Sequence, residues 1–396
     1  SEMCIRDRIK GGNYAVSELE GAIERLGIWQ KLRIDRGNAS LNPNGSVEAS
    51  LDGKIENLPL SVSLKGGPDT PAKAGKKAWP LIIDASTSGA TIKGEGAVVT
   101  IENRKVLQIT TRISGNRFES LGPLIGVSFP EMGKFDLRAD IRSDGDVHEA
   151  GNLWVQIKNN YFSGSARWES KVPRPLLSGR LSTKHLRLSD FEISSKTASK
   201  SKQTGPLDRP IKLDALNAFD ARMEITVKSV ADGSMPVADI SSTVTLTNGE
   251  LKAPFRINLA GVPLDGQVQL RRRNNAPTIL FKATTKNIDV GQTLKQLKIA
   301  EMVTGTVDAL ELKASSAGKT LRTLLEQAAF TLQLKPADMS YPLQIAGKTL
   351  DFTFSGVELT TRKGEPLAAV FEGMLNGSPF NGEISTANLV EIQRAN

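Results

Sequence analysis

Apolar and polar side chains alternate with a period of two along most of this chain. Each alternating run is short and stops at Gly, Asn, Asp or Pro, which is typical of β-strands with one apolar face. We therefore predict a mainly β fold. The clearest runs are Phe135/Leu137/Ala139/Ile141, Leu153/Val155/Ile157, Phe255/Ile257/Leu259, Val268/Leu270, Phe330/Leu332/Leu334 and Leu350/Phe352/Phe354.

Asn-Gly and Asp-Gly dipeptides recur with a similar spacing. Both dipeptides tolerate the positive φ angles of type I′ turns, so they favour antiparallel hairpins. The sheet is therefore predicted to be mostly antiparallel. The eight dipeptides begin at Asn44, Asp52, Asp144, Asp232, Asn248, Asp265, Asn376 and Asn381.

Helical segments are few in the predicted fold. The candidates are Ser17–Leu26, Val290–Leu297 and Thr320–Gln327. Each would form only two or three turns, and a helix of that length is unstable in water unless it packs on a sheet. We expect these segments to punctuate the strands.

Two polar segments are predicted loops, Gly66–Lys77 and Ser194–Gly205, and the second is the better linker because it lacks apolar periodicity. The first eight residues, SEMCIRDR, resemble a translated sequencing adapter and are left out of the fold prediction. The predicted organisation is a non-native segment over 1–8, a first β module over 9–193, a linker over 194–209 and a second, truncated β module over 210–396.

A short motif recurs three times in the sequence. Gly179–Leu186, Phe281–Ile288 and Gly382–Leu389 are similar, and their central threonines lie 102 and 101 residues apart. An even spacing of this kind favours repeated sheet modules over one closed core. One growing sheet can absorb the full length of 396 residues.

The charge pattern adds little to this picture. The net charge of +8 is spread along the chain and permits contact with anionic lipid headgroups or nucleic acid. The basic run Arg271–Arg273 ends a predicted strand, and we interpret it as a solvated hairpin tip.

The single cysteine, Cys4, lies in the excluded segment, so the rest of the chain has no cysteine. A chain without cysteine suits an oxidising compartment. No stretch approaches the roughly 20 apolar residues of a membrane-spanning helix.

Catalytic chemistry has few candidate residues. The two histidines, His148 and His185, are predicted to be solvated or to occupy polar turn positions, and no metal-ligand spacing is present. Gly94-Glu95-Gly96 lacks the third glycine and the helix of a dinucleotide loop. We expect a protein that is not an enzyme, with no catalytic residue, cofactor or metal.

The order of several segments in the first half resembles the AsmA family, and the resemblance extends from Leu19 onward. No single tetrapeptide is diagnostic, so the order of the segments carries the resemblance. In chain order they are Leu51–Lys54, Leu60–Leu64, Trp79–Leu81, Gly89–Ile92, Gly94–Gly96, Leu121–Leu124, Phe129-Pro130, Leu177–Leu181 and Leu186–Phe191. In the second half they are Thr247–Leu251, Pro254-Phe255, Leu259–Gly261, Leu280–Val290, Gly305–Asp308 and Gly318–Leu321.

The resemblance implies a long, curved, taco-shaped β groove similar to that of the bridge-like lipid-transfer proteins. It implies a Gram-negative periplasmic protein, anchored to the inner membrane by an N-terminal segment missing from this chain and linked to outer-membrane biogenesis. The implied partners are phospholipid acyl chains and the inner membrane, with the outer membrane as a further expectation and no nucleic acid.

An apolar sheet face must be covered by curling, by a second sheet or by a ligand. An acyl chain is a suitable ligand, because burying each methylene contributes roughly 0.8 kcal/mol. We expect Arg138, Arg256, Lys282 and Thr353 to occupy the opposite face. The candidate lipid-facing residues are Phe135, Leu137, Ile257, Leu259, Phe281, Phe352 and Phe354.

Two further functions stay open. A scaffold that influences outer-membrane protein biogenesis without lipid cargo would have the same apolar face covered by protein. An enzyme acting on envelope polymers is disfavoured by the lack of a catalytic set.

Overall fold

The computed structural model describes two compact units, each built around an antiparallel β-sheet. Unit 1 comprises the described residues of Ser1–Thr183, Ser189–Glu192 and Ala218–Met223, and unit 2 those of Lys184–Leu188, Ile193–Asn217 and Glu224–Asn396. The described residues are 12–25, 28–55, 57–68, 78–87, 89–125, 132–171, 173–191, 217, 219–231, 236–273, 276–296, 303–345, 348–361 and 365–385.

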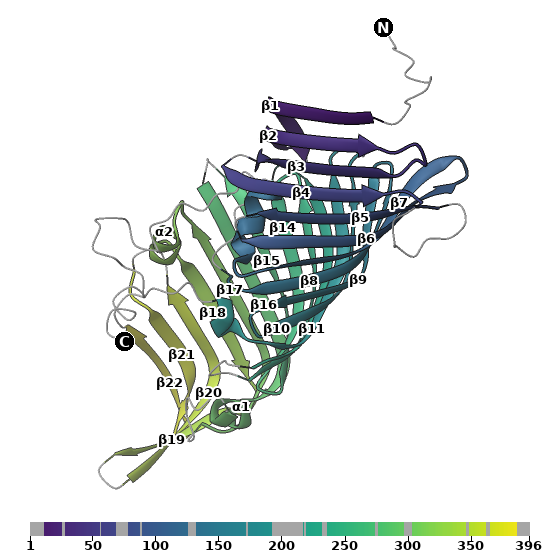
Figure 1. Cartoon of the computed structure of the whole chain (residues 1–396). Coiled ribbons are helices and arrows are strands. Elements are labelled where there is room, and N and C mark those ends of the chain that lie inside the picture. The colour runs from purple at the N-terminus through teal and green to yellow at the C-terminus, as the bar shows by residue number, and fades with distance from the viewer. Residues whose placement is uncertain are drawn as a thin grey trace. The chain divides into compact units, whose positions relative to one another are not determined.

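In unit 1 each strand pairs with the next strand in the chain, and every pairing is antiparallel (Figure 1). Its strands are β1 (Gly12–Arg25), β2 (Ile28–Leu41), β3 (Val47–Ile55), β4 (Leu58–Gly66), β5 (Ala78–Thr87), β6 (Ala90–Ile101), β7 (Arg104–Gly115), β8 (Phe135–Asp144), β9 (Val147–Ile157), β10 (Asn160–Glu169) and β11 (Leu176–Leu186), whose last three residues fall in unit 2. The 3-10 helices η1 (Phe118–Ile125) and η2 (Leu188–Phe191) follow β7 and β11.

In unit 2 the strands also pair with the next strand in the chain as far as β18. β13 to β18 pair successively, and one half of β20 pairs with β18 while the other half pairs with β19. β20 also pairs with β21, and β21 with β22. The strands are β12 (Asp220–Val230, from Glu224 in this unit), β13 (Val237–Thr247), β14 (Glu250–Leu259), β15 (Val262–Arg273), β16 (Ala276–Asp289), β17 (Thr306–Ala317), β18 (Ala329–Pro336), β19 (Ser340–Ile345), β20 (Lys348–Thr361), β21 (Ala368–Leu375) and β22 (Ser378–Ser385).

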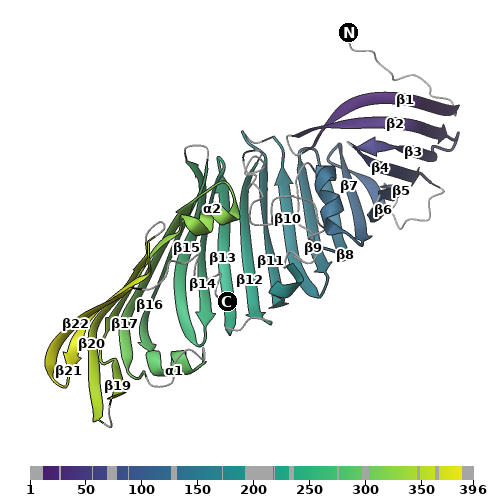
Figure 2. The same ribbon diagram turned by 90° about the vertical axis from the view of Figure 1, so that its left-hand side faces the viewer.

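Two short α-helices lie at opposite ends of the strands of unit 2, as Figures 1 and 2 both show. α1 (Val290–Gln296) follows β16, and α2 (Leu321–Glu326) follows β17. Asp289 caps α1, because its carboxylate accepts a hydrogen bond from the backbone N–H of Gln292 at 2.8 Å. Both helices were predicted from the sequence. The prediction of a mainly β, mostly antiparallel fold with few short helices is confirmed.

The third predicted helix, Ser17–Leu26, was wrong. Gly12–Arg25 is strand β1, which pairs with β2 through most of its length, from Gly12 opposite Leu41 to Arg25 opposite Ile28. A short segment with a central glycine gains little from an isolated helix, whereas β2 offers a full ladder of backbone hydrogen bonds.

Four of the eight dipeptides form the predicted turns. Asn248-Gly249 and Asn376-Gly377 have positive φ at both residues, as a type I′ turn requires, and they join β13 to β14 and β21 to β22. Asn44-Gly45 and Asp144-Gly145 also join successive strands, with positive φ at the glycine.

Three dipeptides lie inside strands, so their turn prediction was wrong. Asp52-Gly53 is in β3, Asp265-Gly266 in β15 and Asn381-Gly382 in β22. At Gly266 and Gly382 the missing side chain leaves room for the rings of Phe255 and Phe371, which lie where a Cβ atom would be. These glycines therefore serve close packing on the sheet. Asp232-Gly233 lies outside the described residues.

Other predicted features are only partly covered by the structure. The linker over 194–209 and most of the loop over 66–77 fall outside the described residues, although Gly66 itself ends β4. Arg271–Arg273 ends β15, as predicted. Thr183 and Thr285 of the sequence repeat lie in β11 and β16, and each is only 7% exposed.

Candidate functional site

A row of apolar side chains crosses unit 1 perpendicular to the strands. The register of successive pairings places one residue from each strand in this row, on the same face of the sheet. The row, from β3 to β10, is Leu51, Val62, Ala85, Ile92, Ile113, Leu137, Val155 and Phe162. With strands about 4.8 Å apart, a row of this kind spans about 34 Å. The hydrocarbon core of a bilayer is roughly 30 Å thick and contains two layers of acyl chains. The row is therefore longer than one acyl chain.

The large side chains of this row are half-buried, and only the small Ala85 is buried. The residues that alternate with them are mostly exposed and polar, as Ser61, Ser63 and Lys65 show on β4. The apolar face is therefore shielded from water in part, without the dense cover of a protein core.

One end of the apolar face in unit 1 is closed. Phe135, 1% exposed, packs with Ala90 and Ile157, and the ring of Phe118 from η1 meets it edge-on at 5.4 Å. Glu119 of η1 accepts a hydrogen bond from the backbone N–H of Met132 at 3.2 Å, and Met132 also packs against this cluster. The helix η1 thus covers the part of the apolar face around Phe135, while the neighbouring row of half-buried side chains is not covered by it.

Unit 2 has two comparable rows on one face. The first, from β14 to β18, is Ala253, Val268, Phe281, Ala314 and Phe330. The second, from β14 to β21, is Phe255, Gly266, Ala283, Leu312, Leu332, Leu359 and Ala369. The leucines and phenylalanines of both rows are half-buried. The rings of Phe255 and Phe281 stack at 5.7 Å.

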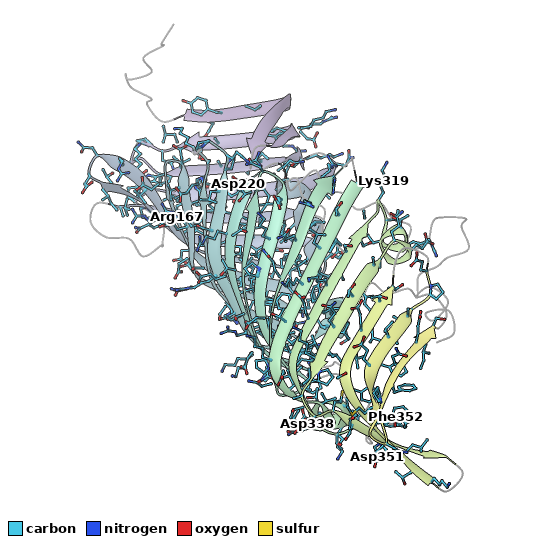
Figure 3. The ribbon with its side chains drawn as sticks, turned by 180° about the vertical axis from the view of Figure 1, so that it is seen from behind. Arg167, Asp220, Lys319, Asp338, Asp351 and Phe352 are labelled. Carbon is cyan, nitrogen blue, oxygen red and sulfur yellow. The ribbon has the colours of Figure 1, made fainter. Side chains whose placement is uncertain are left out.

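Four phenylalanines extend this face over β20 to β22. Phe352 contacts Phe354 at 6.4 Å and Phe380 at 5.5 Å, and Phe371 contacts Phe354 at 6.3 Å and Phe380 at 5.7 Å between ring centroids. All four are half-buried. Figure 3 labels Phe352 near one end of its strand. Ile384 on β22 is 56% exposed, so the apolar surface continues to that strand.

The closed part of unit 2 lies where α1 follows β16. Ile288, Val307 and Met339 are buried there, and Val290, Val303 and Phe354 pack against them. As in unit 1, dense packing is confined to one part of the apolar face.

The opposite face of each sheet carries charged side chains in cross-strand ion pairs. In unit 2, Lys282 and Lys313 approach Glu311 at 2.8 and 2.7 Å, and their hydrogen bonds lower the pKa of Glu311 to about 2. In unit 1, burial opposes ionisation of Asp136, but hydrogen bonds and charges from Arg112 and Arg138 outweigh it and lower the pKa of that carboxyl. The charged face is therefore suited to water.

The structure sorts the predicted lipid-facing residues into two groups. Phe135 shares the apolar face but is sealed under η1, which leaves it almost no surface for a ligand. The half-buried members of the apolar faces are Leu137, Ile257, Leu259, Phe281, Phe352 and Phe354. Arg138, Arg256, Lys282 and Thr353 are exposed on the opposite faces.

Several residues of the apolar faces were not among the predicted ones. They are Val62 in β4, Ile113 in β7, Phe330 in β18, Phe371 in β21 and Phe380 in β22. Their strands show the same period-two pattern, which would have found them. Only the pairing register aligns them into continuous rows.

Each histidine lies beside a serine of a neighbouring strand. His148 was predicted to lie in a turn, but it lies in strand β9. Its Nδ1 is 2.8 Å from Ser143 Oγ. His185 lies in β11, with Nδ1 2.9 Å from Ser229 Oγ. Within the described ranges, no three His, Cys, Asp or Glu side chains are grouped as a metal site would require. Across that same part of the chain, no helix is long and apolar enough to cross a bilayer.

Comparison with known proteins gives one informative match. No family model matches the sequence, and no solved structure matches it. The chain is similar to the AsmA family protein YhjG of Escherichia coli (strain K12), with 21% identity over 351 residues. These residues are 80% of this chain and 51% of that protein, so the chain spans about half the length of this relative. This distant similarity supports a relation between the chain and the AsmA family.

Proposed function

We propose that this chain is part of an AsmA-family protein of the bacterial envelope that binds phospholipid acyl chains on the apolar faces of its sheets and conducts them between membranes. The proposal includes a periplasmic location, an inner-membrane anchor outside this chain and no enzymatic activity. The half-buried, continuous apolar rows are the observation that carries it.

The energetics of an acyl chain suit such a surface. A lipid that leaves a bilayer loses roughly 0.8 kcal/mol for each methylene it exposes to water. A row of aliphatic and aromatic side chains that is continuous across many strands returns a similar amount at each step. Transfer along the row is then close to neutral, so the lipid meets no large barrier.

The degree of burial supports lipid binding over a scaffold without lipid. A scaffold that uses the same face for structure would cover it with other parts of the chain, as η1 covers Phe135. Val62, Ile113 and Leu137 instead keep part of their surface accessible in the centre of unit 1. The similarity to an AsmA family protein supports a function in the envelope and does not separate these two alternatives.

The test compares two adjacent positions on β4. Val62→Asp places a carboxylate on the apolar row, and Ser63→Asp places the same group on the exposed face. Phospholipid that co-purifies with each variant is measured by mass spectrometry, and folding is measured by thermal melting followed by circular dichroism. We expect Val62→Asp to remain folded and lose lipid, because its carboxylate can reach water, while Ser63→Asp keeps both.

Two results would contradict the proposal. Unfolding of Val62→Asp alone would mean that the row is a sealed core, in which an unpaired charge is strongly destabilising. A folded Val62→Asp chain with as much lipid as the unsubstituted chain would mean that the row is not the lipid path.

A further inference from the structure

The charged face of unit 1 contains a hollow of about 900 Å³ over β5 to β8. Most of its lining residues are the outward members of these strands, whose neighbours in sequence belong to the apolar face. The outward side chains with ionic or hydrogen-bonding groups are Asp84, Lys93, Glu95, Gln108, Thr110, Arg112, Arg138, Asp140 and Arg142. The hollow is therefore lined by donors and acceptors in close alternation.

Some of these groups are held in fixed positions. Asp140 accepts hydrogen bonds from Asn152 Nδ2 at 2.7 Å and from Thr110 Oγ1 at 2.9 Å, and these bonds lower the pKa of Asp140. Asn152 reaches it from a bulge in the pairing of β8 with β9, with φ of 47°. Bulges of this kind redirect side chains and are common beside binding sites.

Two aromatic rings flank the hollow on the same face. The guanidinium carbon of Arg138 lies 5.0 Å from the centre of the Trp154 ring, and Trp154 lies 6.0 Å from Tyr161. Tyr161 is 51% exposed, and Gln156 Nε2 donates a hydrogen bond to its hydroxyl at 3.3 Å. About half of the surface of Tyr161 stays accessible, so its ring offers a flat apolar surface to a ligand on this face.

The charges of the hollow offset one another. Asp136 accepts hydrogen bonds from Arg112 at 2.7 Å and from Arg138 at 3.1 Å, and Asp144 pairs with Arg142 at 3.3 Å. A surface without a net field does not concentrate a polyanion or an anionic membrane. Alternating donors and acceptors beside exposed rings fit a polar, uncharged ligand with both hydroxyl groups and C–H faces.

We infer that this hollow, with the rings of Trp154 and Tyr161, binds an uncharged oligosaccharide of pyranose units. The flat C–H face of one pyranose unit packs on the Tyr161 ring, and the hydroxyl groups of further units of the same oligosaccharide bond to Asp140, Gln108 and the outward arginines. The site is separate from the acyl-chain rows and does not depend on them.

The test uses cellotetraose and chitotetraose as soluble probes, with binding measured by isothermal titration calorimetry on the full chain. Tyr161→Ala removes the exposed ring, and Asp140→Asn removes the carboxylate while keeping its shape. Tyr14→Ala is the matched control, because Tyr14 is 54% exposed and shares the apolar face with Ala39. We expect binding of at least one probe, weakened about tenfold by Tyr161→Ala and unchanged by Tyr14→Ala.

Thermal melting of each variant separates loss of the site from loss of the fold. Absence of binding by the unsubstituted chain to both probes would overturn the inference, and so would equal binding by folded Tyr161→Ala and Asp140→Asn. Sedimentation with phosphatidylglycerol vesicles is measured in parallel. Vesicle binding that requires Tyr161, without oligosaccharide binding, would make the rings a membrane contact and also overturn it.

Discussion

The guanidinium of Arg112 on β7 forms two hydrogen bonds to the carboxylate of Asp136 on β8, at 3.0 Å from Nε and 2.7 Å from Nη2. The two residues are offset by two positions in the pairing, since Arg112 lies opposite Arg138 and Asp136 opposite Ser114. Asp136 thus lies between the two arginines and pairs with both. This diagonal contact links neighbouring strands on the outward face of the sheet.

Asp136→Asn should lower the melting temperature at pH 7, by an amount equivalent to about 1 kcal/mol or less because Arg112 and Arg138 are more than half exposed. The pKa of Asp136 is lowered in the folded chain, so its contribution is present above the unfolded value of about 3.9 and is lost as pH falls through the folded value. Melting curves of the variant and the unsubstituted chain should therefore converge in acid. A difference that is constant from pH 7 to strong acid would exclude an ionic origin.

Phe135→Ala should destabilise unit 1 by about 3–5 kcal/mol, because it leaves a cavity under η1. Leu137→Ala, two residues along the same strand and face, should cost clearly less, since its half-buried side chain leaves a site open to solvent. Urea denaturation followed by circular dichroism gives both values. Equal losses would show that the row is packed as densely as the closed end.

Gly266→Ala should destabilise unit 2 by about 1–3 kcal/mol, because the new Cβ would overlap the ring of Phe255 and the backbone oxygen of Lys282. Gly356→Ala on β20 is the control, since the nearest atom to its Cβ would be Glu372 Oε2 at 3.9 Å. The free energy of unfolding should change little there. If both variants lose the same stability, strand propensity and not the Phe255 ring explains the effect.

Phe281→Asp and Phe352→Asp should each reduce co-purified phospholipid while leaving the chain folded, because both rings are half-buried on the apolar face. Thr353→Asp, exposed on the opposite face beside Phe352, should leave lipid unchanged. Mass spectrometry of bound lipid and thermal melting are measured on the same samples. Lipid retained by both phenylalanine variants would place the lipid path away from unit 2.

The amino-acid sequence by itself determined which face of a strand each residue occupies. Side chains alternate across a strand, so Phe281 and Lys282 must lie on opposite faces wherever the strand pairs. The same local pattern marked α1 and α2 and the turns at Asn248 and Asn376, because those turns depend on φ preferences within two residues.

The tertiary structure decided what depends on neighbouring strands. Ser17–Arg25 is part of a strand because β2 forms backbone hydrogen bonds along its length. Asp265-Gly266 lies within β15, where the ring of Phe255 occupies the space that a side chain at Gly266 would fill. The alternation gave Phe135 and Leu137 the same face, but only the packing of η1 sealed one and left the other open. Propensity and alternation are properties of adjacent residues, whereas register and burial depend on contacts between residues distant in the sequence.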